Sequence, residues 1–314
     1  MMLLARAAER VYWTGRYLER AENTARIVQQ YSQLLLDLPD EVGVRWSELV
    51  RIFGATGTFT ARPGESDEAA VFRFLVADVK SPPSLAASIR MARDNIRNTR
   101  DLLPQESWEA VNELDQFARS NLASAKDGED RFEVLSECIA RCLQIDGVLV
   151  GTMSHGAPYQ FLLLGQSIER ADMTSRIIDV GAAYVRSAPE IVERFDSVLG
   201  SNVLKSVSGF QMYRQYCQPQ VEGRRVVDFL LRDGQFPRAV ACALNRAREA
   251  CLALPQGQAS LTALDAALDL PGEAPNPSLT PDQVPAAMDR LQQRLDAAHR
   301  QVARTWFLTP GGGS

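Results

Sequence analysis

The sequence predicts an all-α protein, a single closed helical domain built from two helical repeats that a pseudo-twofold axis relates. Apolar residues recur at helical spacing along almost the whole chain. No segment alternates apolar and polar residues in the way that a half-buried strand requires. A charged motif also occurs once in each half of the chain, and an internal repeat of this kind determines the architecture.

The two copies of the motif lie at Gly15–Ile27, which reads GRYLERAENTARI, and at Gly165–Ile177, which reads GQSIERADMTSRI. A glycine, the triplet Glu-Arg-Ala, an acidic residue, a threonine, an arginine and an isoleucine keep the same positions in both copies. If the two halves are related by a pseudo-twofold axis, we expect the charged residues of both copies to meet across it.

The first element is a long helix over residues 3–37, which carries apolar residues at helical spacing and has Pro39 beyond its end. Proline is tolerated in the first turn of a helix, so Pro83 and Pro104 each favour a helix start. A break is expected at Lys126–Gly128. The helices expected up to residue 187 span, in order, 3–37, 46–54, 67–78, 84–101, 104–125, 130–152 and 157–187.

The second half repeats the order of the first, and three stretches match at a constant offset. They are Phe74–Asp78 with Phe229–Asp233, Pro82 with Pro237, and Ala92–Asp94 with Ala247–Glu249. We therefore predict one domain over 1–310, with the first repeat at about 1–150 and the second at about 151–310. The remaining residues, 311–314, are predicted to be a flexible Gly/Ser tail.

Closure of the domain depends on the last helix, which we expect over residues 281–308. By order and length it corresponds to the helix at 130–152, which leads into the second motif helix. To play the same part for the first motif helix, it must pack beside residues 3–37. We expect this contact to resemble the one between 130–152 and 157–187.

The composition is that of an ordinary soluble globular protein, with 46% hydrophobic and 23% charged residues. A net charge of −5 argues against nucleic-acid binding, which usually requires a basic surface. Charged residues interrupt the N-terminus, and the apolar runs are too short to span a bilayer. We therefore expect no membrane partner and a cytoplasmic location, with the five cysteines present as thiols.

The candidate binding residues are the polar side chains of the two motif helices that share one helical face or border it. They are Arg16, Glu19, Arg20, Glu22, Asn23 and Arg26 in the first copy, and Glu169, Arg170, Asp172 and Arg176 in the second. Gln166 and Met173 stand where the first copy has Arg16 and Asn23. Any site is therefore expected to be asymmetric, with its fuller side on the N-terminal helix.

These charged residues have three possible roles. Arginines and carboxylates can form a buried ion network that sets the register of two helices, which is the usual role of buried ionic groups. Alternatively, the arginines bind phosphate or another anion, or a Mg²⁺ ion is bound by Glu19, Glu22, Glu169 and Asp172. A transition metal is not expected, because the chain has only two histidines and lacks the Glu-x-x-His pattern of di-iron bundles. No set of catalytic residues can be identified.

Two segments, 54–68 and 201–224, are poorly patterned and contain aromatic residues among glycines, serines and arginines. They are expected to be exposed, either as parts of a binding surface near the motif helices or as ordinary connections. Residues 255–282 are rich in proline and are expected to be a surface loop around a short helix.

The segment Ala8–Arg26, which reads AERVYWTGRYLERAENTAR, resembles the opening of the bacterial alpha-E family, an all-helical domain named for its Glu-Arg motif. The segments Ala92–Asn95, Gly151–Met153 and Leu164–Asp172, with the closing Trp306-Phe307, are also similar to this family. The resemblance spans essentially the whole chain. It places the family motif at Glu19-Arg20, with Glu169-Arg170 as its counterpart.

The resemblance implies a role beside circularly permuted ATP-grasp amide ligases, with which alpha-E proteins are associated as neighbours or fusions. The family is also associated with transglutaminase-like and amidohydrolase-like proteins. This chain would then be the helical component of an amide-bond-forming system, and it would bind the ligase, a peptide or amino-acid substrate, or both. ATP and Mg²⁺ would be bound by the ATP-grasp partner, and no cofactor is expected in this chain.

Two alternatives to this role stay open. In the first, the chain is an amide ligase or transferase in its own right, and its paired Glu-Arg motifs bind a carboxylate or a phosphorylated intermediate. In the second, it is a purely structural helical scaffold.

Overall fold

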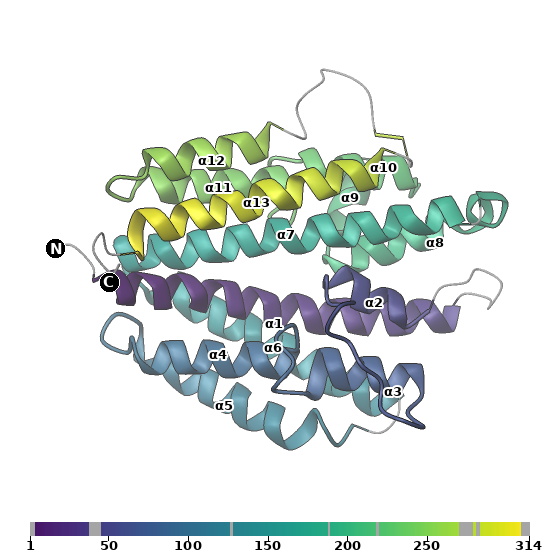
Figure 1. The fold of residues 1–314 in the computed structure, drawn as a ribbon, viewed down its shortest axis with the longest axis horizontal. Helices are drawn as coiled ribbons and strands as arrows, with labels where there is room; N and C mark the ends of the chain where they lie inside the picture. The colour runs from purple at the N-terminus through teal and green to yellow at the C-terminus, as the bar shows by residue number, and fades with distance from the viewer. Residues whose placement is uncertain are drawn as a thin grey trace.

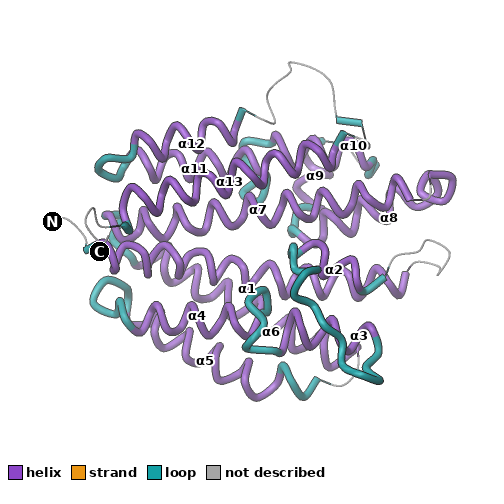
Figure 2. The backbone as a smooth tube through the Cα atoms, viewed as in Figure 1, coloured by secondary structure: helices purple, strands orange, loops and turns teal. Residues whose placement is uncertain are grey.

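The computed structural model describes residues 4–37, 45–125, 128–187, 189–217, 220–269, 279–280 and 283–308, with the backbone alone at 180, 182–195 and 216. Within these ranges the regular structure is entirely helical and contains no strand (Figure 2). The predicted all-α class is therefore confirmed.

The helices follow the predicted order, and most of their ends lie within a few residues of the expected ones. The first half contains α1 (Ala5–Asp37), α2 (Ser47–Ile52), α3 (Asp67–Phe72), α4 (Leu85–Arg97), α5 (Gln105–Asn121) and α6 (Gly128–Thr152). The second half contains α7 (Ala157–Ser187), α8 (Pro189–Ser206), α9 (Phe210–Tyr216), α10 (Gly223–Arg232), α11 (Val240–Leu252), α12 (Gln258–Leu268) and α13 (Val284–Trp306). A π-helical turn, Arg73–Ala77, continues α3.

Short polar residues and proline set several helix starts in the first half. Ser66 and Ser84 precede α3 and α4, and their hydroxyl oxygens accept hydrogen bonds from the backbone amides of Ala69 and Ala87 at 3.3 and 3.0 Å. These contacts satisfy amide groups that have no partner within a first helical turn. Pro104 directly precedes α5, as its position in the sequence predicted.

Helices α1 and α7 lie side by side at the centre of the molecule and run in the same direction (Figure 1). On one side α4 and α6 pack on α1, and α5 packs on both of them. On the other side α11 and α13 pack on α7, and α12 packs on both of them. The two halves thus have the same packing order in one all-helical domain. The pseudo-twofold axis and the limits of the repeats stay predictions.

The prediction that the last helix of each half packs on the motif helix of the other half is largely wrong. Helix α13 packs chiefly on α7 and α12, and α6 packs on α1 and α5, so each stays with its own half. The reason is that a short connection from α6 to α7 does not oblige the two helices to pack, and the apolar face of α6 fits its own bundle. Instead α8 packs on α1 and α2 packs on α7, which joins the halves.

The last helix does reach α1 at one place, near its own C-terminal end. The ring of Tyr12 lies 5.7 Å from that of His299 and 5.3 Å from that of Phe307, between centroids. The indole of Trp306 donates a hydrogen bond to the carbonyl oxygen of Pro255 at 2.8 Å. The closing Trp306-Phe307 therefore attaches α13 both to α1 and to the loop before α12.

The segment 201–224 is largely helical and only partly exposed, so the expectation of an exposed segment is wrong in part. It contains the end of α8, all of α9 and the start of α10, and Tyr213 is fully buried with its ring 5.6 Å from that of Phe229. The buried aromatic residue gives the segment a core contact that its irregular pattern concealed. The segment 54–68 is mostly exposed, although Phe59 packs against Phe74.

The Pro-rich stretch contains the short helix that was expected, α12, while 270–278 and 281–282 lie outside the described residues. Of the predicted break at Lys126–Gly128, Gly128 is the first residue of α6, and the other two residues lie outside the described ranges, as does the tail at 311–314. All five cysteines are free thiols, as predicted, and four of them are buried.

Glycine sets the distance between the two central helices. A Cβ atom added at Gly15 would lie 2.2 Å from the carbonyl oxygen of Leu162, and one added at Gly165 would lie 2.1 Å from that of Tyr12. Backbone atoms cannot rotate away as a flexible side chain does, so any side chain would force the helices apart. The repeated glycine marks the closest approach of α1 and α7, and each Glu-Arg pair follows about one turn later.

Replacing Gly15 with alanine should therefore lower the free energy of unfolding by about 1–3 kcal/mol, the usual cost of overpacking. The matched control is Gly147→Ala on the exposed face of α6, where an added Cβ meets nothing within 4 Å. That change should stabilise the protein by about 0.5–1 kcal/mol, because alanine suits a helix better than glycine. Urea unfolding of both variants measures the difference, and equal stability would contradict the close approach.

Candidate functional site

The Glu-Arg pairs of the two halves bind each other across the α1–α7 contact. Glu169 of α7 accepts hydrogen bonds from Nε and Nη2 of Arg20 at 2.5 and 3.0 Å. In the other direction, Glu19 of α1 accepts hydrogen bonds from Nε and Nη2 of Arg170 at 2.9 and 2.6 Å. Each carboxylate is thus held by the planar fork of the opposite arginine. We call these four residues the reciprocal network.

Further donors complete the coordination of both carboxylates. Glu169 also accepts a hydrogen bond from Nε of Arg16 at 2.6 Å. Glu19 accepts one from the side-chain amide of Asn23 at 2.9 Å and one from Nη1 of Arg238 at 3.1 Å. The motif residues therefore satisfy the buried charges largely among themselves, as an ion network between two helices requires.

Arg238 was not among the predicted site residues, although it occupies the centre of one side. It precedes α11 and donates hydrogen bonds to Glu22 at 2.6 Å and to the side-chain oxygen of Asn23 at 2.7 Å, besides the one to Glu19. The alignment of the halves places Pro83 at the matching position, so the repeat did not indicate it. The available signal was a charged residue two positions before a helix that is apolar at its start.

The ten predicted residues form three groups in the structure. Arg16 and Arg20 share Glu169. The second group joins Glu19 and Arg170 through Arg238 to Asn23 and Glu22, and Glu22 accepts a hydrogen bond from Arg26 at 2.7 Å. In the third group Arg176 donates to Asp172 of the same helix at 2.9 Å.

The polar contacts are unequal on the two sides. Met173, at the position that matches Asn23, is 3% exposed and lies in the hydrophobic core. Gln166, which matches Arg16, donates a hydrogen bond to Asp146 of α6 at 2.7 Å instead of binding a network carboxylate. The copies are thus alike in the residues that bind each other and different in those around them.

Burial and charge act in opposite directions on the two central carboxyls. Glu19 and Glu169 are each 1% exposed, and burial alone would raise their pKa values. The arginines more than offset it, Arg170 and Arg238 for Glu19 and Arg20 and Arg16 for Glu169, so both pKa values are lowered. Both side chains are therefore carboxylates at neutral pH, and neither is suited to accept a proton there.

The Mg²⁺ interpretation does not fit this geometry. Every carboxylate that it required, namely Glu19, Glu22, Glu169 and Asp172, accepts hydrogen bonds from at least one arginine. A cation among them would have to displace guanidinium groups that already neutralise the site. The arrangement instead supports the ion-network interpretation, with anion binding left to those arginines that have donors to spare.

A stripe of cationic and aromatic residues runs along α1 beside this network, and we call it the aromatic stripe. It consists of Trp13, Arg16, Tyr17 and Arg20. The rings of Trp13 and Tyr17 are stacked, with centroids 5.2 Å apart and an interplanar angle of 26°. The Cζ atom of Arg16 lies 5.3 Å from the Trp13 ring centre, and that of Arg20 lies 5.6 Å from the Tyr17 ring centre. His299 of α13 meets Trp13 edge-on at 5.3 Å.

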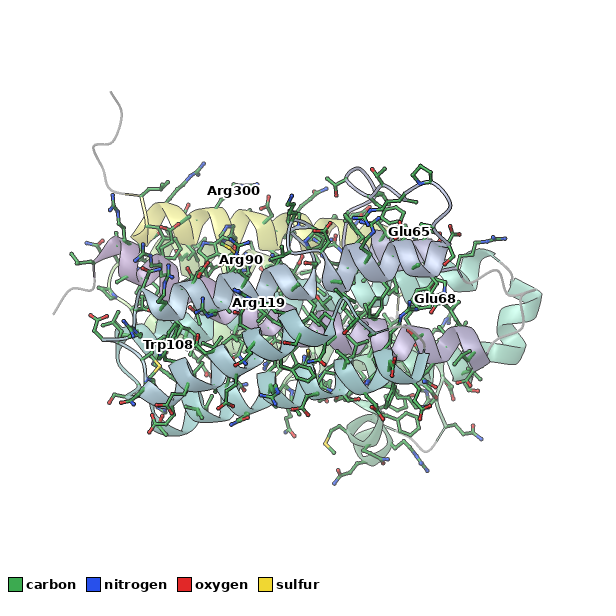
Figure 3. All side chains as sticks on the ribbon, turned by 90° about the horizontal axis from the view of Figure 1, so that it is seen from below. Glu65, Glu68, Arg90, Trp108, Arg119 and Arg300 are labelled. Atoms are coloured by element: carbon green, nitrogen blue, oxygen red, sulfur yellow. The ribbon has the colours of Figure 1, made fainter. Side chains whose placement is uncertain are left out.

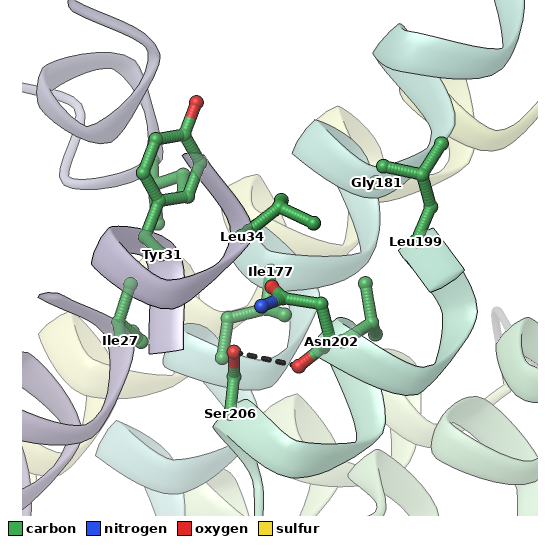
Figure 4. A pocket seen from close by; sticks show the side chains of 10 residues that line it. Ile27, Tyr31, Leu34, Ile177, Gly181, Leu199, Asn202 and Ser206 are labelled. Atoms are coloured by element: carbon green, nitrogen blue, oxygen red, sulfur yellow. Dashed lines mark hydrogen bonds between the residues drawn. The ribbon is translucent and has the colours of Figure 1, made fainter. Parts of the chain in front are cut away.

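A small apolar cavity of about 30 Å³ lies beyond the network, where α1, α7 and α8 enclose it (Figure 4). Ile27, Tyr31 and Leu34 line it from α1, and Ile177 lines it from α7. This volume corresponds to about one water molecule. A cavity of this volume is too small for an organic ligand.

The outer surface carries ion pairs of a different kind from those at the centre. Figure 3 labels Arg90, Arg119 and Arg300 on the outer faces of their helices and Glu65 near α3. The side chains of Arg300 and its partner Asp296 are 58% and 57% exposed. Such pairs contribute only about 0–1 kcal/mol, so they do not determine the fold. Among the described helices, none is long and apolar enough to cross a membrane.

The helical fold and the Glu-Arg motif are those of one family. Residues 3–307 match the Alpha-E family, which is described as a predicted alpha-helical domain with a conserved ER motif. The match covers essentially the whole chain, so this chain belongs to the Alpha-E family.

Curated relatives of the chain occur in mycobacteria. The uncharacterized protein Mb2597 of Mycobacterium bovis is 25% identical over 269 residues, which are 80% of this chain and 30% of that protein. The uncharacterized protein Rv2567 of Mycobacterium tuberculosis is 24% identical over the same shares. The chain therefore spans about 30% of the length of these relatives. No solved structure matches it.

Removing one partner of the reciprocal network should be costly. Glu169→Gln leaves Arg16 and Arg20 without a carboxylate in the core, and should lower the free energy of unfolding by about 3–5 kcal/mol. The control is Asp296→Asn, which breaks an exposed pair with Arg300 and should cost less than about 1 kcal/mol. Denaturant unfolding at pH 7 compares them, and a loss under 1 kcal/mol for Glu169→Gln would contradict a stabilising network.

Stability should also depend on pH through His299. Burial first, and then the nearby Arg16 guanidinium, lower the pKa of this imidazole to about 4, from 6.5 in an unfolded chain. The neutral ring is therefore favoured on folding, and its contribution is complete above pH 6.5 and lost as the pH falls toward 4. The carboxyls of Glu19 and Glu169 also have lowered pKa values, so they change the stability only below their unfolded pKa of 4.5.

Replacing His299 with glutamine should therefore flatten the fall of the melting temperature between pH 7 and pH 5. The measurement is a series of thermal melts of both proteins at intervals of half a pH unit. Below about pH 4 the two curves should fall in parallel, because the His299 contribution is then lost and the network is unchanged in the variant. Parallel curves over the whole range would exclude this role for His299.

Proposed function

We propose that this Alpha-E chain is the helical component of an ATP-grasp-linked system that forms amide bonds in a peptide-like product. In this proposal it binds the ligase, the peptide or amino-acid substrate, or both. ATP and Mg²⁺ belong to a circularly permuted ATP-grasp partner. This chain contributes a rigid helical surface on which the partner or the substrate is held.

The reciprocal pairing of the two Glu-Arg motifs favours a binding component over an enzyme. Glu19 and Glu169 are both buried and bound by arginines of the opposite helix. A carboxylate whose pKa is lowered by two guanidinium groups is a poor general base at neutral pH. The residues that name the family therefore hold α1 against α7, which supports a scaffold with binding surfaces.

The length of the curated relatives supports a role within a larger assembly. The aligned segment is about 30% of each of these proteins, so there the domain is joined to a much longer chain. Domains joined in one chain commonly form interfaces with each other. This supports the view that an Alpha-E domain works in contact with another domain.

The alternative of an amide ligase or transferase in its own right is favoured by one feature, the arginines of the aromatic stripe. Arg16 and Arg20 both bind the single carboxylate of Glu169, so they carry one positive charge in excess. A site of this kind can hold a substrate carboxylate. The two arginines provide no nucleophile or proton acceptor themselves, so binding is the simpler function for them.

The test is co-purification of the chain with a circularly permuted ATP-grasp protein of the same organism, followed by an assay of ATP consumption with an amino-acid mixture and Mg²⁺. We expect a stable complex, and product that depends on both proteins. The purified chain alone should neither hydrolyse ATP nor join amino acids. Product from the chain alone would favour the enzyme alternative. Absence of a complex, together with an unchanged ligase rate, would leave the purely structural role.

A further inference from the structure

The aromatic stripe distinguishes the first half of the chain from the second. The repeat aligns each residue of the stripe with one residue of α7. The pairs are Trp13 with Leu163, Arg16 with Gln166, Tyr17 with Ser167, and Arg20 with Arg170. Only the last pair is alike, and it is the pair that the reciprocal network requires. The network therefore does not account for the other three residues of the stripe.

The arginines of the stripe have donors beyond those that Glu169 uses. An arginine carries five N–H donors. Glu169 accepts one hydrogen bond from Arg16 and two from Arg20. Within the described part of the chain, Glu169 therefore leaves most of the N–H donors of these two arginines unused. The side chain of Arg20 is 23% exposed and that of the buried Arg16 is 10% exposed, and Trp13, Tyr17 and His299 are partly exposed beside them.

The charges around the stripe leave one positive charge in excess. Two guanidinium groups face one carboxylate, Glu169. The nearby Asp172 is paired with Arg176, and Asp296 on α13 is paired with Arg300. The two half-buried rings next to the arginines offer an apolar surface of the kind on which a side chain or a peptide plane packs.

We propose that the aromatic stripe binds the free carboxylate of a peptide-like ligand, with the carboxylate on Arg16 and Arg20 and the adjoining residue on the stacked rings of Trp13 and Tyr17. Glu169 orients both arginines and keeps them in place, so little side-chain freedom is lost on binding. A single excess charge matches a monoanion, and the planar fork of arginine matches a carboxylate. The choice of a peptide as the ligand rests on the proposed function.

The experiment is calorimetric titration of the full chain, without any ATP-grasp protein, with three probes at pH 7. They are the tripeptide Ala-Ala-Phe with a free C-terminal carboxylate, the same tripeptide as its C-terminal amide, and inorganic phosphate. We expect the acid to bind at least about tenfold more tightly than the amide, because charged hydrogen bonds are lost with the carboxylate. Phosphate should bind more weakly than the acid.

The decisive variant is Arg16→Gln, which gives α1 the residue that α7 carries at the matching position. It leaves the four residues of the reciprocal network unchanged, and it should abolish the preference for the acid. Tyr17→Ser, again the residue of α7, should weaken both tripeptides, and it provides a second variant if the first melts below the assay temperature. Arg119→Gln, on the exposed face of α5, is the control and should bind as the unaltered chain does.

Three results would overturn the inference: equal binding of acid and amide, an acid preference that survives Arg16→Gln in a folded protein, or phosphate that binds as tightly as the acid. Because no ligase is present, these results do not bear on complex formation with an ATP-grasp protein. A chain that binds the ligase but not the tripeptide acid would retain the proposed function and lose this inference.

Discussion

The structure depends on the reciprocal exchange of charge between α1 and α7. Each helix supplies one carboxylate and one guanidinium to the other, at a point that glycine brings unusually close. Four charges can be buried there only because each meets its opposite with matching geometry. The remaining bundle follows from this contact, since α4 and α6 take their places on α1, and α11 and α13 take theirs on α7.

Local features of the sequence were sufficient for the elements and for the central contact. Helical spacing, prolines and the repeated motif predicted the helices, and the matching Glu-Arg pairs predicted that the charges would meet. The partners of α6 and α13 could not be predicted in the same way, because a helix with an apolar face can pack on several neighbours and sequence order does not choose among them. Tyr213 was misjudged for a related reason, since its burial is decided by Phe229 on another helix.

The candidate site was predictable where it repeats and not where it is unique. All ten predicted residues bind a partner on the same or the opposite motif helix, as their spacing suggested, and Glu19, Glu22 and Asn23 also bind Arg238. Arg238 itself has no counterpart in the first half, where Pro83 stands. Three helices must be assembled before this arginine meets Glu19, so no local pattern could indicate it.

The exchange between the motif helices is self-complementary, since a helix that carries both Glu and Arg can pair with an identical helix as well as with a related one. Surfaces of this kind join the identical subunits of twofold-symmetric dimers. In a dimer of one gene product, every substitution would appear on both sides at once. Joining the two copies in a single chain removes that constraint. One copy is then free to keep the charge exchange alone, while the other gains a tryptophan, a tyrosine and a second arginine beside it.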